Sequence, residues 1–170
     1  MGDDELSSAL GAATIGSAAT DGTLHPPSPR LFLVSDLHVN CEDNFRWLEQ
    51  LSSTAFLEDG LIVAGDVSEE LEQLEAALRL LRSKFSRVWF TCGNHDLWLT
   101  PNDARSGCRT SMTKCEEIMD ICEALGVETG PGRFGEAEEG RGVWVWPLLS
   151  FHHQSFDTEP EVQGWEVPAA

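Results

Sequence analysis

Three short apolar runs, each followed at once by acidic, amide or imidazole side chains, restrict most strongly how this chain can fold. The runs cover residues 30–35, 61–65 and 87–92, and each has the length and composition of a buried β-strand. The polar residues that follow are, in chain order, Asp36 and His38, then Asp66, then Asn94, His95 and Asp96. If the strands are parallel neighbours, their carboxyl ends meet at one edge of a sheet. The sequence therefore predicts that these side chains converge on one site.

Stretches with helical periodicity separate the runs. The clearest helix is predicted over residues 69–85, and weaker apolar stripes predict helices over 43–53 and 111–125. A further apolar run, residues 143–149, predicts a fourth strand that is buried on both faces. Strands that alternate with helices indicate an α/β fold with a largely parallel sheet and right-handed crossovers.

The composition changes near residue 30. Residues 1–29 are rich in Gly, Ala, Ser and Thr and end in Pro26-Pro27-Ser28-Pro29, a composition that buries too little apolar surface to fold. We therefore predict a disordered, low-complexity tail over residues 1–29 and one folded domain over residues 30–170. The hydrophobic content of the whole chain, 41% of 170 residues, is ordinary for a globular protein with a core.

Charge and cysteine content limit the partners and the compartment. The 29 acidic and 11 basic residues give a formal charge of -18, which would repel nucleic acid and anionic membranes, so we expect neither as a partner. A phosphorylated substrate would meet the same repulsion unless bound cations reversed the local field. No apolar run approaches the roughly 20 residues that span a bilayer, and no signal peptide or CxxC pair is present. We expect a cytoplasmic protein with reduced cysteines.

Taken singly, each polar motif has an ordinary structural explanation. Asp36 could cap a turn and His38 could face solvent, while Asp66 could cap the following helix. Asn94 could be a turn residue and His95 a hydrogen-bonded loop histidine. The order of the motifs favours a site instead, because Asp-x-His, Gly-Asp and Gly-Asn-His-Asp each follow their own strand. Mixed nitrogen and oxygen donors of this kind suit several transition metals.

The ordered set Asp36-x-His38, Gly65-Asp66 and Gly93-Asn94-His95-Asp96 resembles the first three signature motifs of the calcineurin-like metallophosphoesterases. The similarity covers roughly residues 31–150, and residues 87–98 and 143–157 are also similar to a plant and algal branch of the superfamily. The resemblance implies an α/β/β/α sandwich with a β-α-β-α-β core sheet. It also implies phosphoester hydrolysis with two divalent or mixed-valence metal ions, Mn, Fe or Zn.

Roles for the metal ligands follow from the resemblance alone. Asp36 and His38 would hold the first metal, and Asn94 would bind the second. Asp66 would bridge the two, since a carboxylate has two oxygens and a charge that offsets the repulsion between cations. The ions would activate a shared water as the nucleophile.

His95 and Asp96 are the catalytic residues that the resemblance implies. His95 would lie near the scissile phosphate and stabilise it or protonate the leaving group, with Asp96 orienting the imidazole. The substrate would be a phosphorylated small molecule or protein. Trp98, close to this motif, could stack on a base or simply pack.

The chain departs from the family after these motifs, since it has no later Gly-His-x-His segment. His152 and His153 are the only histidines after His95, and we interpret them as substrate-side or structural residues rather than ligands. We therefore expect the chain to form the N-terminal portion of the sandwich, which would be incomplete, and to have reduced or no activity. One face of its sheet would then be exposed and could mediate self-association.

Two alternatives remain open at this level. The chain could be a non-catalytic relic or interaction module of the same fold. A different phosphate-handling α/β fold of the haloacid-dehalogenase kind is weaker, because that pattern needs Asp-x-Asp where this chain has Asp36-x-His38.

Overall fold

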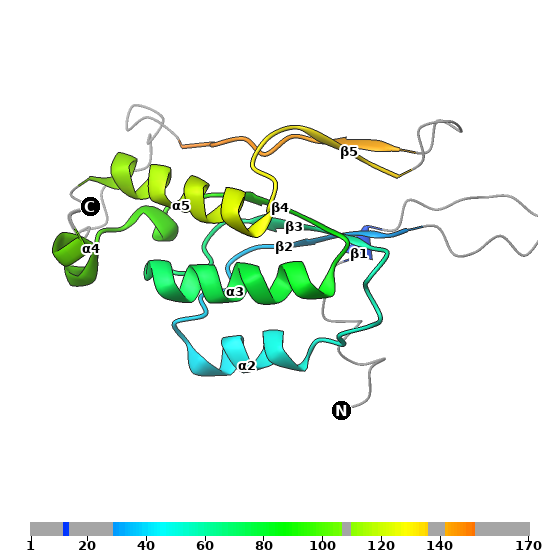
Figure 1. Ribbon diagram of the computed structural model, residues 1–170, viewed down its shortest axis with the longest axis horizontal. Helices are drawn as coiled ribbons and strands as arrows, with labels where there is room; N and C mark the ends of the chain where they lie inside the picture. Colours follow the sequence, from blue (N-terminus) through cyan, green and yellow to red (C-terminus); the bar gives the residue numbers. More distant parts are fainter. Residues whose placement is uncertain (1–11, 14–28, 107–109, 136–141, 152–170) are drawn as a thin grey trace, which may run out of the picture.

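A computed structural model describes residues 12–13, 29–106, 110–135 and 142–151 of the chain (Figure 1). Its main sheet has the order β1-β2-β3-β4, made of Ala12–Ala13, Leu31–Val34, Gly60–Ala64 and Arg87–Thr91. β2 pairs with β3 and β3 with β4 in parallel, while β1 runs antiparallel to β2. The predicted β-α-β-α-β core of an α/β fold is confirmed.

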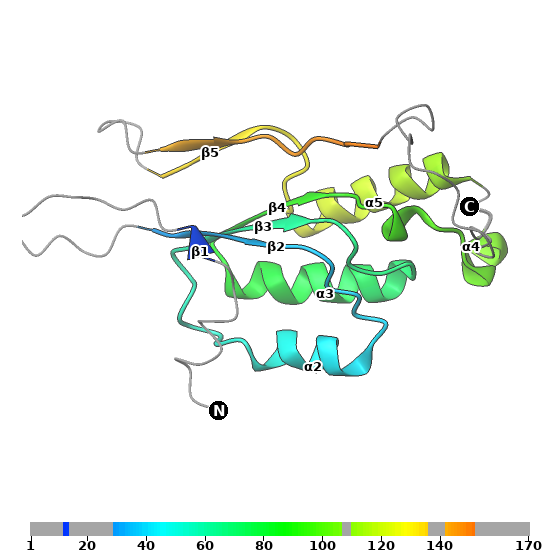
Figure 2. The same cartoon turned by 180° about the vertical axis from the view of Figure 1, so that it is seen from behind.

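The helices connect the parallel strands and lie on one side of the sheet. α2 (Glu42–Gln50) joins β2 to β3, and α3 (Leu71–Lys84) joins β3 to β4. After β4 come the 3-10 helix η1 (His95–Leu97), α4 (Pro101–Ser106) and α5 (Ser111–Leu125), and α5 packs against α3. In Figures 1 and 2, α2 and α3 cover the same face of the sheet.

Local side-chain chemistry sets the ends of two helices. α5 begins with a reciprocal capping box between Thr110 and Thr113 and ends at Gly126, whose φ of 67° lies in the left-handed region. α2 ends at residue 50, earlier than predicted, because the Ser52 hydroxyl accepts the N–H groups of Thr54 and Ala55 and forms a turn. No helix in the described ranges is long and apolar enough to cross a membrane.

Alternating side chains divide the sheet into two apolar faces. The face toward the helices carries the main buried cluster, which the sheet supplies with Phe32, Leu61, Val63, Val88 and Phe90. Cys115 and Cys122 of α5 are buried in this cluster, as core packing requires. The opposite face carries a smaller cluster around Trp89, with Ile62 and Leu31 packed against it.

A two-stranded hairpin covers part of this second face. β5 (Gly132–Phe134) and β6 (Val143–Val145) pair antiparallel, and Phe134 and Val145 complete the cluster around Trp89. Figure 2 shows the resulting layers: helices, main sheet and hairpin. This arrangement is a partial α/β sandwich.

The prediction of a further strand over residues 143–149 is confirmed only for its first three residues, and the predicted burial on both faces is wrong. β6 has three residues, and the described chain beyond it forms no strand. Only one face of the hairpin packs on the sheet, so the other apolar residues of the run face solvent. The side chains that are exposed by between 56% and 67% are Trp144, Trp146, Leu148 and Leu149.

Two further predictions fall largely outside the described residues. Ala12–Ala13 form β1 and pair with β2, although they lie within residues 1–29, for which the sequence predicts disorder. The remaining residues before 29, and His152 and His153, lie outside the described ranges. The extent of the tail and the role of the two histidines stay predictions.

Candidate metal centre

The loops that leave β2, β3 and β4 stay paired beyond the ends of their strands. Asp36 N donates to the Gly65 carbonyl oxygen over 3.1 Å, and His38 N donates to the Asp66 carbonyl oxygen over 3.0 Å. Val39 N then donates to the Val67 carbonyl oxygen over 2.9 Å. These bonds hold the loop after β2 against the loop after β3 at the carboxyl edge of the sheet, where the sequence predicts a site.

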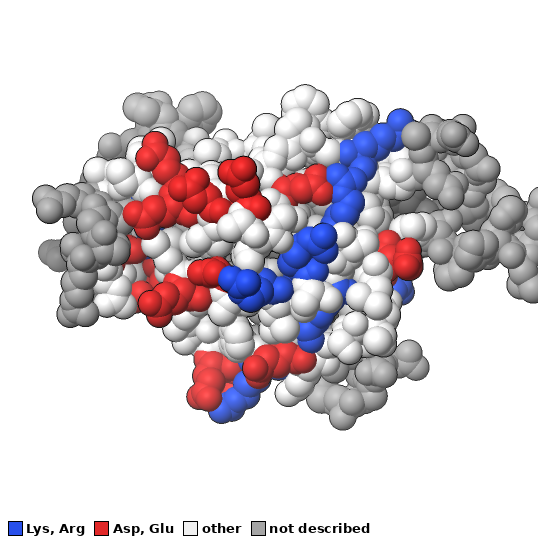
Figure 3. All heavy atoms as spheres, in the orientation of Figure 1, with Lys and Arg blue, Asp and Glu red and all other residues white. Residues whose placement is uncertain are grey.

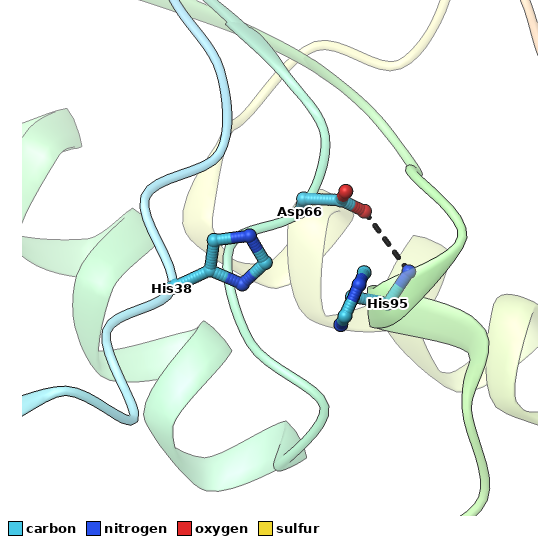
Figure 4. Close-up of side chains that lie close together, drawn as sticks. All are labelled: His38, Asp66 and His95. Atoms are coloured by element: carbon cyan, nitrogen blue, oxygen red, sulfur yellow. Dashed lines mark hydrogen bonds between the residues drawn. The ribbon is translucent and has the colours of Figure 1, made fainter. Parts of the chain in front are cut away.

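Three of the predicted site residues form one cluster (Figure 4). His38, Asp66 and His95 each offer a ligand atom, and these atoms lie within 4.8 Å of one another. The two imidazole rings meet edge to face with centroids 4.8 Å apart. His95 N donates to Asp66 Oδ1 over 2.9 Å, so the other carboxylate oxygen is left to bind a ligand.

The backbone at this edge is strained in a way that serves the cluster. Asp36, His38 and Asp66 have φ values of 56°, 42° and 54°, and they are the non-glycine residues with positive φ in the described part of the chain. Left-handed backbone costs an L-residue about 1–2 kcal/mol. All three are predicted metal ligands, and such strain persists where surrounding contacts enforce it and function uses it.

Two glycines let the loops approach each other closely. A Cβ on Gly65, whose φ is 78°, would lie 2.4 Å from the Gly93 nitrogen. A Cβ on Gly93 would lie 2.1 Å from Asp66 Oδ1. The glycines of the Gly-Asp and Gly-Asn-His-Asp motifs are therefore required by the contact between the loops, and not only by the turns that they make.

Asp36 and Asn94 lie at the rim of the cluster. The side chain of Asp36 is 66% exposed, and its Oδ1 is 4.0 Å from His38 Nε2. Asn94 is exposed and precedes η1. Together with Asp66 it lines a groove that also borders Trp89 on the main sheet. The structure thus brings His38, Asp66 and His95 together and leaves the other two predicted ligands beside them, open to solvent.

The predicted role of Asp96 needs a correction. Asp96 is fully buried, and its oxygens accept backbone N–H groups from Gly93 and from residues 66–68 rather than holding the His95 imidazole. Burial raises the pKa of the Asp96 carboxyl, and the four N–H groups act in the opposite direction. All four contacts are N–H donors, which a carboxyl group accepts through its two oxygens. Both oxygens of the carboxylate are therefore engaged by backbone N–H groups of the two loops.

An aromatic contact and a buried lysine shape the side of the cluster next to η1. The Trp98 ring contacts the His95 ring with centroids 3.7 Å apart and the two planes tilted by 36°. Lys114 is fully buried and donates to the carbonyl oxygens of Trp98 and Glu69 and, over 3.0 Å, to Asp103 Oδ2. Sequence reasoning missed Lys114, although it lies four residues before Ile118 on a buried helix face.

Surface charge is unevenly distributed on the face seen in Figure 3. Acidic side chains gather toward the end of the molecule that holds α4 and the start of α5, whereas a band of lysine and arginine crosses the C-terminal part of α3. On this face, the side nearer the carboxyl ends of the strands is therefore the more negative one, and such a field raises the local concentration of cations.

Comparison with known proteins identifies the family. The pattern described as calcineurin-like phosphoesterase matches residues 29–158. The chain belongs to this family. Its members use divalent metal ions, and two imidazoles with a carboxylate are a donor set that such ions accept. The arrangement of His38, Asp66 and His95 fits that requirement.

Two comparisons point to the same relative. The chain is 32% identical over 129 residues to the acyl-carrier-protein phosphodiesterase PptH of Mycobacterium tuberculosis, a match that covers 75% of this chain and 39% of that protein. The crystal structure of PptH, described as a phosphopantetheinyl hydrolase, matches with a TM-score of 0.61 and 30% identity over 72% of this chain and 43% of the other. The chain therefore spans less than half the length of its relative.

Proposed function

We propose that this chain supplies the metal-binding N-terminal part of a phosphoester hydrolase. The observation that carries the proposal is the convergence of His38, Asp66 and His95 at the carboxyl edge of a parallel sheet, with ligand atoms within 4.8 Å. Membership of the calcineurin-like phosphoesterase family supports it. When bound, two divalent or mixed-valence ions, Mn, Fe or Zn, would supply an activated water and neutralise charge on the phosphoryl group.

Each predicted site residue has a proposed role in metal binding or proton transfer. His38 and Asp36, whose side-chain atoms lie 4.0 Å apart, would hold the first ion. Asp66 would be shared by the two ions, and Asn94 would provide a neutral oxygen to the second. His95 faces the phosphoryl group and donates a proton to the leaving oxygen.

The relative supports a proposal for the substrate class. PptH is named as a phosphodiesterase of acyl-carrier protein, which favours a phosphodiester among the phosphorylated small molecules and proteins that this site could take. The apolar groove of about 1160 Å³ that begins at Asp66 and Asn94 does not by itself select among them. Placement in the plant and algal branch and location in the cytoplasm stay predictions.

Turnover by this chain alone should be low or absent. We propose four metal ligands, and the sequence contains no Gly-His-x-His segment to complete two coordination shells. The chain then represents a truncated portion of the working domain. A chain with an incomplete site should still bind one ion, because the proposed ligands Asp36, His38 and Asp66 already lie close together.

A non-catalytic interaction module is the second candidate. The exposure of Trp144 and Trp146 on the hairpin favours it, because large apolar side chains that face solvent are typical of surfaces that bind a partner. The same motifs would then persist without turnover.

Metal analysis of the purified chain tests the proposal. After exposure to manganese, iron and zinc, elemental analysis gives the stoichiometry, and hydrolysis of a phosphodiester and a phosphomonoester is measured on the same sample. Bound metal at stoichiometric level supports a metallohydrolase site, and turnover of the diester supports the enzyme over the module. A chain that binds no metal under any of these conditions contradicts the proposal.

A further inference from the structure

Asp96 makes contacts that its predicted role does not explain. Asp96 Oδ2 accepts the N–H groups of Asp66 and Gly93, each over 2.9 Å. Oδ1 accepts the N–H groups of Val67 over 2.8 Å and of Ser68 over 3.1 Å. One side chain thus joins three successive peptide groups after β3 to one after β4. Successive N–H groups that turn toward one point form an anion-binding concavity, and here the anion is a carboxylate of the chain itself.

The cross-link between the two loops is reciprocal. The backbone of Asp66 donates to the side chain of Asp96, and the backbone of His95 donates to the side chain of Asp66 over 2.9 Å. The loop after β2 joins the same unit, because His38 N donates to the Asp66 carbonyl oxygen over 3.0 Å. All three loops that carry the cluster are therefore connected through the residue Asp66.

The backbone of Asp66 needs such support. Its φ of 54° is unfavourable for a residue with a side chain, and the neighbouring Gly65 and Gly93 are too close for any added atom. A fully buried carboxylate with four N–H donors stabilises this turn, because each of these hydrogen bonds would be lost if the turn relaxed.

We propose that Asp96 is a positioning residue, whose carboxylate holds the loops after β3 and β4 so that His38, Asp66 and His95 meet. The inference deepens the proposed function and rests on it for the identity of the ligand, a divalent metal ion. Asp96 itself touches neither metal nor substrate. Residues that orient metal ligands from behind change metal affinity typically by 10–100-fold when they are replaced.

The variant Asp96→Asn tests this role with little change in volume. Its amide nitrogen replaces one acceptor oxygen and faces two N–H donors, so two of the four hydrogen bonds are lost. Asp96→Glu keeps both oxygens and serves as the conservative variant. Asp59→Asn is the matched control, because Asp59 is also buried at 4% exposure and accepts a backbone N–H, from Arg30, but precedes β3 at the far end of the strand.

Nuclear magnetic resonance of the chelator-treated full chain gives the first readout, at a temperature where all variants are folded. In the wild type we expect slow exchange of the amide protons of residues 66–68 and 93 and a nuclear Overhauser effect between the His38 and His95 rings. Asp96→Asn should speed exchange at these amides roughly tenfold or more, as loss of hydrogen bonds to a charged group implies, and should lose the ring contact. Asp96→Glu should restore part of both. Asp59→Asn should keep the slow amide exchange and the ring contact, even if its melting temperature falls as much as that of Asp96→Asn.

Titration with Mn²⁺ gives the second readout on the same proteins. We expect Asp96→Asn to bind about 10–100-fold more weakly and Asp59→Asn to bind as the wild type does. The positioning role is overturned if Asp96→Asn retains both the ring contact and the amide protection. It is also overturned if this variant binds Mn²⁺ with wild-type affinity, whatever its melting temperature. If the wild type binds no Mn²⁺, the proposed function fails, and the exchange and ring-contact measurements still decide the role of Asp96.

Discussion

At the scale of single residues, Gly93 has the tightest constraint at the candidate metal centre. We predict that Gly93→Ala weakens Mn²⁺ binding by at least about tenfold, because its Cβ would lie 2.1 Å from Asp66 Oδ1 and displace the carboxylate. The affinity is measured by Mn²⁺ titration of folded protein. Gly130→Ala is the control, since a Cβ there meets no atom within 4 Å and should leave the affinity unchanged. Equal affinities for the two variants would contradict the tight contact.

His95 lies close enough to the other cluster residues to be either a ligand or a proton donor. We predict that His95→Ala retains metal but lowers the kcat of a complete hydrolase by roughly 10²–10⁴, the size of a general-acid contribution. His38→Ala should instead release metal, because His38 is proposed as a ligand. Metal content and kcat are compared for both variants in a chain that turns over. Loss of metal from both would assign His95 to the ligand set.

At the scale of the elements, the buried pair Lys114 and Asp103 fastens α5 to the chain after η1. The N–H of Thr100 and the ammonium group of Lys114 lower the pKa of the Asp103 carboxyl, although burial opposes them. A lowered folded-state pKa contributes stability that is fully present above the ordinary value of about 4 and is lost as the pH falls through the lowered value. We predict that Asp103→Asn removes this acid sensitivity, measured by urea unfolding between about pH 2 and pH 6.

The same pair also holds Trp98, whose carbonyl oxygen accepts from Lys114 while its ring contacts that of His95. Lys114→Met should destabilise the fold by about 3–5 kcal/mol, because it removes one partner of a buried ion pair. The double variant Asp103→Asn with Lys114→Met should recover part of that loss in urea unfolding. No recovery would mean that the carbonyl contacts of Lys114, rather than the ion pair, hold the element in place.

The comparison of sequence with structure shows which elements a pattern can predict. Parallel strands such as β4 have central residues that are buried on both faces, so a continuous apolar run marks them and places the polar residues at their ends. The run that contains β6 looks the same, but burial there depends on what lies across the hairpin, which local sequence does not contain. The hydrogen-bond donors to Asp96 could not be predicted from the sequence either, because residue type does not indicate which N–H groups surround a buried carboxylate.

At the scale of the whole molecule, the unpartnered side of the hairpin determines how the chain behaves in solution. In β6 the side chain of Val145 packs on the sheet at 7% exposure, while the neighbouring Trp144 and Trp146 are 63% and 62% exposed. Leu148 and Phe151, which follow in the chain, are also exposed, at 67% and 53%. Removal of several such side chains from water favours association, since each large apolar side chain contributes about 1.5–3 kcal/mol when fully buried.

We predict that the isolated chain self-associates through this surface in a concentration-dependent way, which sedimentation equilibrium across a dilution series will measure. The double variant Trp144→Glu with Trp146→Glu should remain monomeric, because two carboxylates in the contact would have to lose their water. Met112→Glu is the matched control, since Met112 on α5 is equally exposed at 69% but lies in a different element. If Met112→Glu disrupts association as strongly as the tryptophan variants, added negative charge on a chain already at -18 is the cause, and the hairpin is not the contact. If the wild type stays monomeric at every concentration, the exposed tryptophans do not drive self-association, and the interaction module loses the observation that favours it.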